Sequence, residues 1–213
     1  FYQKMKRKIK LILWDFGGVL TESPIKKFKE FEKNNKIPIG TIVNINSNNK
    51  YDNAWAKLEK NLINKKQFSK LFLKEAKNLN IEEELNIDEI LACLNVDLNE
   101  EMVSFFLKLK DKMPCACLTN NISENVSKDA GDTFLNFKKN FIQVFESCKI
   151  GMRKPEKKIY EYVARQLSVK PENILFLDDL GVNLKIAKSV GFITHKVEKT
   201  DDTITYLKKM LNI

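Results

Sequence analysis

The stretch DFGGVL, residues 15–20, follows directly on an apolar run that spans residues 9–14. A short apolar run that ends at glycines predicts a buried parallel strand, and the glycines predict a sharp turn beside a group that must come close. Asp15 then lies at the carboxyl end of a strand, which is the edge where ligands bind in open α/β sheets. An Asp before two glycines is also a common turn sequence, so this stretch alone leaves a structural interpretation open.

Three further polar segments follow in order along the chain. Thr119-Asn120 follows the apolar run 115–118, Lys154-Pro155 ends the stretch GMRKP, and Asp178-Asp179 follows the apolar run 174–177. Because parallel strands end at one edge of a sheet, we expect these side chains to converge with Asp15.

Alternating apolar runs and helical spacings predict an α/β fold, a Rossmann-like doubly wound parallel sheet with an inserted helical domain. The further strands are expected at 115–118, 141–145, 174–177 and 192–197, and the helices at 100–110, 155–167, 182–190 and 201–211. Pro155 is expected in the first turn of its helix, and Gly191 is expected to stop the helix before it. The predicted domains are 1–20 with 101–213 as the α/β core, and 21–100 as the helical cap.

The segment 21–100 shows helical spacing instead of strand-like runs. Trp55, Leu58 and Leu62 recur at i, i+3 and i+7, which predicts one apolar helix face. The Asn-rich stretch 37–50, with one Pro and one Gly, predicts a loop between helices.

Composition bounds the function classes. The chain has 213 residues, 43% of them hydrophobic, and a formal charge of +9. The lysines are spread over nearly every segment and no nucleic-acid signature accompanies them, so we expect no nucleic-acid partner. No stretch approaches a membrane-spanning length, and the basic start before residue 11 precedes an apolar run too short for a signal peptide. These features predict a cytoplasmic protein without a membrane partner; the oligomeric state is left open.

With these segments placed, the chain resembles the haloacid dehalogenase (HAD) superfamily of phosphohydrolases. The resemblance is carried by DFGGVL (15–20), LTNN (118–121), ESCKIGMRKPEKKIY (146–160) and FLDDLGVNLKIAKSVG (176–191). It is strongest to the branch that contains the N-terminal phosphatase domain of soluble epoxide hydrolase and a similar domain of a multidomain acyl-CoA dehydrogenase. The resemblance implies an HAD-like core with a helical cap, and a hydrolase that uses Mg²⁺.

The resemblance also implies a role for each acidic residue. Asp15 would be the nucleophile, forming an aspartyl phosphate, and also a metal ligand together with the main-chain carbonyl of Gly17. Asp179 would bind the metal directly, and Asp178 would act through a water. Oxygen ligands with waters retained are what Mg²⁺ prefers.

The remaining site residues would bind the phosphate. Thr119 would donate its hydroxyl and Asn120 its backbone N–H, while Lys154 would supply a fixed positive charge to nucleophile and phosphate. Phe16 and Gly17 would line the substrate site, and Asn183 would position the acidic pair. As a lysine before a helix-starting proline, Lys154 is expected to contribute little to packing.

One position departs from the family pattern. Most members carry a second Asp two residues after the nucleophile, which protonates the leaving group and then activates water; here that position is Gly17. Glycine transfers no proton, so a phosphatase with this sequence is expected to be slow.

Three hypotheses therefore stay open, in this order. The first is a magnesium-dependent phosphatase acting on a small phosphorylated metabolite. The second is a dehalogenase, which needs no leaving-group acid, although the intact Asp178-Asp179 pair disfavours it. The third is a catalytically weak protein that binds phosphate or a partner.

Overall fold

The computed structural model describes residues 8–123, 126 and 132–213 of the chain. Its centre is a parallel sheet, as the alternation of runs predicted, and the structure places the strands in the order β3-β2-β1-β4-β5. The strands are β1 (Leu11–Trp14), β2 (Cys115–Thr119), β3 (Val144–Glu146), β4 (Ile174–Asp178) and β5 (Ile193–Lys196). The α/β Rossmann-like fold class is confirmed.

The first strand, β1, lies in the middle of the sheet and sets the register of the site. Trp14 pairs with Cys117 on one side and with Leu177 on the other. Asp15 and Asp178 come one residue later and Thr119 two residues later, so all three lie at the carboxyl edge of the sheet.

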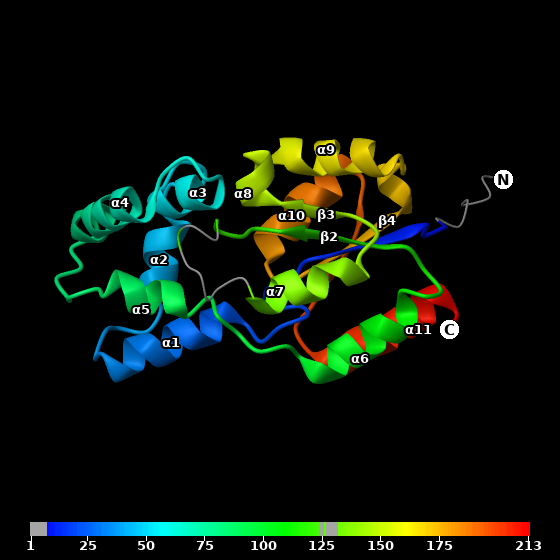
Figure 1. The fold of residues 1–213 in the computed structure, drawn as a ribbon, viewed down its shortest axis with the longest axis horizontal. Helices are drawn as coiled ribbons and strands as arrows, with labels where there is room; N and C mark the ends of the chain where they lie inside the picture. The colour runs from blue at the N-terminus through cyan, green and yellow to red at the C-terminus, as the bar shows by residue number, and fades with distance from the viewer. Residues whose placement is uncertain (1–7, 124–125, 127–131) are drawn as a thin grey trace.

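Helices cover both faces of the sheet (Figure 1). On one face lie α6 (Glu100–Leu109), α7 (Asp132–Phe137) and α11 (Thr200–Leu211); on the other lie α8 (Ser147–Ile150), α9 (Lys157–Leu167) and α10 (Gly181–Val190). Every residue of β1 is buried, because Ile12 and Trp14 pack toward the first set of helices and Leu11 and Leu13 toward the second. Two short 3-10 turns, Lys138–Asn140 and Pro171–Asn173, precede β3 and β4.

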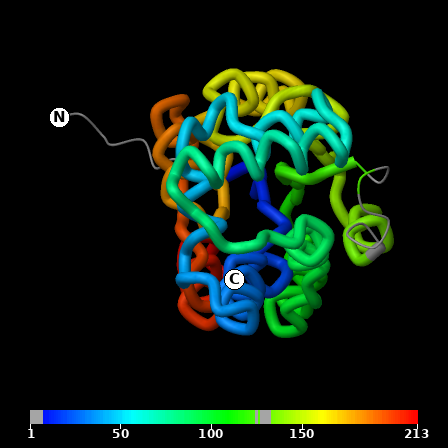
Figure 2. Tube along the Cα trace, turned by 90° about the vertical axis from the view of Figure 1, so that its left-hand side faces the viewer, coloured from blue at the N-terminus to red at the C-terminus, as the bar shows by residue number. Residues whose placement is uncertain are grey.

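Between β1 and α6 the chain forms a helical segment at the end of the sheet (Figures 1 and 2). It consists of α1 (Pro24–Asn34), α2 (Thr41–Ser47), α3 (Ala54–Glu59), α4 (Lys65–Asn78) and α5 (Ile87–Ala92). This segment has an apolar cluster of its own around Trp55, whose ring centroid lies 5.8 Å from that of Phe28 and 5.3 Å from that of Phe68. Its designation as a separate cap domain, and the domain limits, stay predictions.

The helical segment leaves and rejoins the core at one place. Thr21 and Leu98 form an antiparallel bridge, with Glu22 N–H donating to Asp97 O at 2.9 Å and Asn99 N–H to Leu20 O at 2.9 Å. The two connections are therefore paired neighbours.

Two details of the helical segment differ from the sequence predictions. The stretch 37–50 is not only a loop, because α2 lies within it; the buried Glu32 carboxylate accepts the N–H groups of Gly40 (2.6 Å) and Ile42 (2.7 Å) and so satisfies the start of that helix. Leu62 does not continue the face of Trp55 and Leu58, since α3 ends at Glu59 and the Leu62 side chain is 63% exposed.

Some helices and strands of the core begin or end at other residues than the sequence predicted. Pro155 is not in the first turn of a helix, because α9 begins at Lys157 and the residues before it form a turn. The expected strand 141–145 is Val144–Glu146, while Gly191 does end α10. No helix in the described part of the chain is long and apolar enough to cross a membrane. Residues 1–7 of the basic start lie outside the described residues.

Candidate active site

Three carboxylates converge at the carboxyl edge of the sheet. Asp15 follows β1, Asp178 ends β4 and Asp179 begins the loop to α10. One oxygen of each lies within 4.8 Å of the others, the spacing of ligands around a single cation. The sequence prediction that these side chains would meet is thus matched in space; their catalytic roles stay predictions.

Lys154 is the cation at the centre of this cluster. Its Nζ lies 2.7 Å from Asp15 Oδ1 and 2.8 Å from Asp178 Oδ2, and only 1% of the residue is exposed. The expectation that Lys154 contributes little to packing is wrong, because the chain buries its whole side chain between two acids. Among the described residues, Lys154 is the lysine that forms ion pairs with this cluster. Three carboxylates and one ammonium leave a formal charge of −2, which one divalent cation would balance.

Asp178 and Asp179 have different surroundings. Both oxygens of Asp178 accept from Asn183 Nδ2 at 3.0 Å, and Oδ1 also accepts from Leu180 N–H at 2.8 Å, in addition to the Lys154 contact. Asp178 is therefore fully engaged by protein donors. Asp179 stands at the rim of the same cluster, which leaves it the freer of the two to bind a cation.

Gly17 and Gly18, which follow Asp15 and Phe16, differ in backbone conformation and in the space around them. Gly18 has a positive φ of 72°, and a Cβ placed on it would clash with Asp179 Oδ2. Gly17 is not in that strained region, and a Cβ there would meet nothing closer than Pro24 Cγ at 3.9 Å. Gly18 is thus the glycine that lets the loop approach Asp179, a role that the sequence reasoning did not assign, although the Gly-Gly pair signalled a close approach.

Asn120 holds the backbone of Lys154. Its Nδ2 donates to Lys154 O at 2.9 Å, and its Oδ1 accepts from Lys154 N–H at 2.9 Å. The sequence reasoning gave Asn120 only a backbone role and missed this side-chain contact, because nothing local in the sequence links residues 120 and 154. Thr119 ends β2, is buried and lines the adjoining cavity, and Phe16 N–H donates to Asp15 Oδ1 at 2.7 Å.

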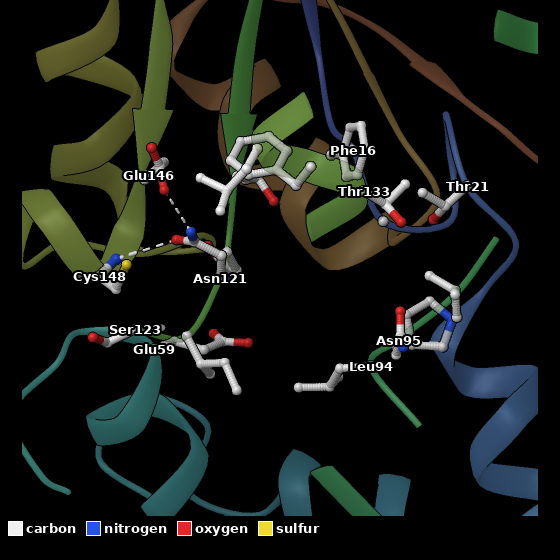
Figure 3. Close-up of a pocket in the computed structure, with 18 of the residues that line it drawn as sticks. Phe16, Thr21, Glu59, Leu94, Asn95, Asn121, Ser123, Thr133, Glu146 and Cys148 are labelled. Carbon is white, nitrogen blue, oxygen red and sulfur yellow. Dashed lines mark hydrogen bonds between the residues drawn. The ribbon is translucent and has the colours of Figure 1, made fainter. Parts of the chain in front are cut away.

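A cavity of about 360 Å³ opens beside these residues (Figure 3). One side is formed by the sheet edge, including Phe16, Gly17, Thr119 and Asn120. The helical segment forms the other side, with Trp55, Glu59, Asn61 and residues 94–96. Asn121 donates from Nδ2 to the Glu146 carboxylate at 2.8 Å at the margin of this cavity, as Figure 3 shows.

Burial and crowding shift the protonation of the site. Burial raises the pKa of Asp15 well above its ordinary value; the Lys154 ammonium opposes this rise, and the charges of Asp178 and Asp179 add to it. Burial, then the Asp178 carboxylate, raise the pKa of Asp179 to about 6. Burial alone would lower the pKa of Lys154, but Asp15 and Asp178 outweigh it and raise that pKa. Because the pKa values of Asp15 and Asp179 lie above their usual range, an added cation would favour the charged form of both.

The sequence and the fold both match known proteins. A family model described as haloacid dehalogenase-like hydrolase matches residues 9–191. Mouse acyl-CoA dehydrogenase family member 10 is 30% identical over 96% of this chain, and mouse bifunctional epoxide hydrolase 2 is 32% identical over 62% of it. The chain spans only 19% and 24% of these relatives' own lengths.

Solved structures show the same architecture. An HAD family enzyme of Bacteroides thetaiotaomicron, in complex with magnesium and inorganic phosphate, is 25% identical with a TM-score of 0.59 over 89% of this chain and 94% of that one. The L-2-haloacid dehalogenase of Xanthobacter autotrophicus, with chloropropionic acid covalently bound, is 16% identical with a TM-score of 0.60 over 94% of this chain and 83% of its own. The second likeness concerns the fold alone.

Proposed function

The chain belongs to the haloacid dehalogenase-like hydrolases, and from that membership we propose that it is a magnesium-dependent phosphatase acting on a small phosphorylated metabolite. The observation that carries this proposal is the approach of Asp15, Asp178 and Asp179 within 4.8 Å, with Lys154 against two of them. Three acids and one ammonium form a site short of positive charge. A divalent cation would supply the missing positive charge, and together with Lys154 it would attract the negatively charged phosphate group of a substrate.

The residues fit Mg²⁺ in type and in charge. Asp15, Asp179 and the carbonyl of Gly17 would hold it, with Asp178 behind them, and all of these donors are oxygen atoms. Bound there, Mg²⁺ would neutralise charge on the nucleophile and on the phosphate oxygens. The Mg²⁺ complex of the Bacteroides enzyme supports this choice of metal.

In the first half-reaction an Asp15 carboxylate oxygen attacks phosphorus, and the bond from phosphorus to the ester oxygen breaks. Lys154 stabilises the charge on the transferring oxygens, and Thr119 donates its hydroxyl to one of them. The leaving oxygen departs with the bonding electron pair. Since Gly17 offers no proton, we expect leaving groups that are stable as anions, such as phenolates, to react fastest.

In the second half-reaction water attacks the phosphorus of the aspartyl phosphate, the bond from Asp15 to phosphorus breaks, and inorganic phosphate leaves. The attacking water must lose a proton, and Gly17 again offers no base. We therefore expect this step to limit turnover and the phosphoenzyme to accumulate.

The decisive experiment is a rapid-mixing assay with an aryl phosphate, in Mg²⁺ and after chelation, on wild type and Asp15→Asn. The proposal predicts a burst of one phenolate per site that requires Mg²⁺ and Asp15. Hydrolysis that persists under chelation would contradict the metal assignment.

The dehalogenase hypothesis is tested in the same protein. Displacement of halide by a carboxylate needs no metal, so 2-chloropropionate should be hydrolysed under chelation if that hypothesis holds. The convergence of Asp178 and Asp179 on Asp15 favours the metal-dependent reaction. Phosphate binding without any hydrolysis would instead support the third hypothesis, a catalytically weak phosphate-binding protein.

A further inference from the structure

A buried ion pair joins the helical segment to the residue that precedes Lys154. Arg153 Nε donates to Glu59 Oε2 at 2.5 Å, and Arg153 Nη1 donates to the carbonyl of Lys50 at 2.8 Å. Arg153 and Glu59 are both buried, although they are far apart in the chain. A buried charge pair of this kind holds its two segments in one arrangement, because breaking it would leave a charge without a partner.

The contact continues into the core of the helical segment. Glu59 Oε1 accepts from Trp55 Nε1 at 3.0 Å, and the Trp55 ring packs against Phe68 and Phe72. Trp55 and Glu59 also line the cavity beside the sheet edge, and Figure 3 shows Glu59 next to the ribbon of α3. One short helix thus contributes both to the cavity wall and to the contact with Arg153.

Two parts of the molecule hold the backbone around Lys154. Asn120 binds its N–H and its carbonyl from the end of β2, and Arg153, one peptide bond away, is held by α3. The ammonium of Lys154 is in turn 2.7 Å from Asp15 and 2.8 Å from Asp178. The placement of this lysine therefore depends on the sheet and on the helical segment together.

We propose that Arg153 is a positioning residue, which makes the placement of the Lys154 ammonium depend on the docking of α3 through Glu59 and Trp55. The inference rests on the proposed function, in which Lys154 binds the phosphate. It adds that the cavity wall and the phosphate-binding lysine are held in register by one buried contact. A substrate that contacts Trp55 in the cavity is thereby aligned with the Lys154 ammonium, which binds its phosphate group.

The same interface supplies a matched control. Lys60, the residue after α3, lies 2.9 Å from Glu156, and both side chains are 12% exposed. Neither residue lines the cavity, and Glu156 keeps a second partner in Lys158 at 3.1 Å. Lys60→Met therefore weakens the docking of the helical segment without touching the Arg153 contact.

The test measures the affinity for inorganic phosphate in Mg²⁺ by calorimetry, and aryl phosphate hydrolysis, for wild type, Arg153→Met, Arg153→Lys, Glu59→Gln and Lys60→Met. We expect Arg153→Met to weaken phosphate binding and to lower kcat by about tenfold each, with Arg153→Lys recovering part of the loss. Glu59→Gln keeps an acceptor for Trp55 but removes the charge that pairs with Arg153. Its phosphate affinity and kcat should lie between those of wild type and Arg153→Met. Lys60→Met should lower the melting temperature while phosphate affinity stays within about twofold of wild type.

A double-mutant cycle separates positioning from general loss of stability. If Arg153 acts through Lys154, adding Arg153→Met to Lys154→Met should change phosphate affinity no further. Additive losses, an Arg153→Met variant with wild-type phosphate affinity, or an equal loss in Lys60→Met would each overturn the proposal. A wild-type protein that binds no phosphate in Mg²⁺ and hydrolyses no aryl phosphate would overturn the proposed function as well.

Discussion

The carboxyl edge of the sheet and the helical segment solve different physical problems. At the sheet edge, buried polar groups satisfy one another, with Lys154 between Asp15 and Asp178, and Asn183 behind Asp178. The core of the helical segment is an aromatic and aliphatic cluster. Directional contacts tolerate little change in residue type, whereas apolar packing accepts exchanges of similar volume. We therefore expect the sheet edge to determine the reaction and the helical segment to determine what fits beside it.

The largest effect is expected from paired substitutions, one in each region. Lys154→Met keeps the volume of the lysine but removes its charge, and should lower kcat for an aryl phosphate about 10³-fold. Phe72→Leu, at a fully buried position of the helical segment, should cost about 1 kcal/mol of unfolding free energy and change kcat less than about threefold. Steady-state kinetics and thermal unfolding measure both. Equal losses of kcat would erase the distinction between the two regions.

The next effect tests whether the sheet edge lacks only a proton carrier. Gly17→Asp introduces a carboxylate where a Cβ meets nothing closer than 3.9 Å, and should speed breakdown of the phosphoenzyme by about 10². The burst expected in wild type should then merge into steady turnover. Glu22→Gln serves as the control for a neighbouring proton donor and should leave the burst unchanged. Fast wild-type turnover without a burst would show that another group already carries the proton.

A smaller effect distinguishes the two adjacent glycines. Gly18→Ala would push a methyl group against Asp179 and force a positive φ on alanine, so Mg²⁺ affinity should fall about tenfold. Gly17→Ala should change it less than about twofold, since the space beside it is open. Titration of the melting temperature with Mg²⁺ measures both affinities. Equal losses of Mg²⁺ affinity in the two variants would mean that any substitution in the loop weakens binding, and that the contact of Gly18 with Asp179 has no special part in it.

The last prediction concerns the pH dependence of stability without metal. The pKa of Asp179 is raised from an ordinary 3.8 to about 6, so the folded protein favours its neutral form. The associated stability is present below about pH 3.8 and is lost as pH rises through about 6, a change of about 3 kcal/mol. In EDTA, wild type should therefore become less stable than Asp179→Asn across this range. Millimolar Mg²⁺ should reverse the order at pH 7, and an unchanged order would argue against Asp179 as a ligand.

Sequence reasoning reached the sheet and the acidic cluster because both depend on local signals. The apolar runs before Asp15, Thr119 and Asp178 predicted parallel strands, and parallel strands bring their carboxyl ends to one edge. The positions of these side chains then followed from strand register.

Contacts between distant segments were missed for a physical reason. α2 is stabilised at its start by Glu32, the backbone of Lys154 is held by Asn120, and Arg153 pairs with Glu59. Each contact depends on a partner that only the folded chain brings near. Composition and periodicity carry no information about such pairs, so the helix in 37–50 and the full burial of Lys154 could not be anticipated.

The paired connections at Thr21 and Leu98 make the helical segment exchangeable. Because the chain leaves the sheet and returns at adjacent residues, everything between them can change in length or in sequence without moving a strand. Such a segment can be replaced, and the wall of the cavity with it, while the strand that carries Asp15 keeps its place; the replacement must still hold Arg153 as α3 does through Glu59. A graft of the corresponding segment from another member of the family, joined at these two residues, is the natural route to a new substrate range.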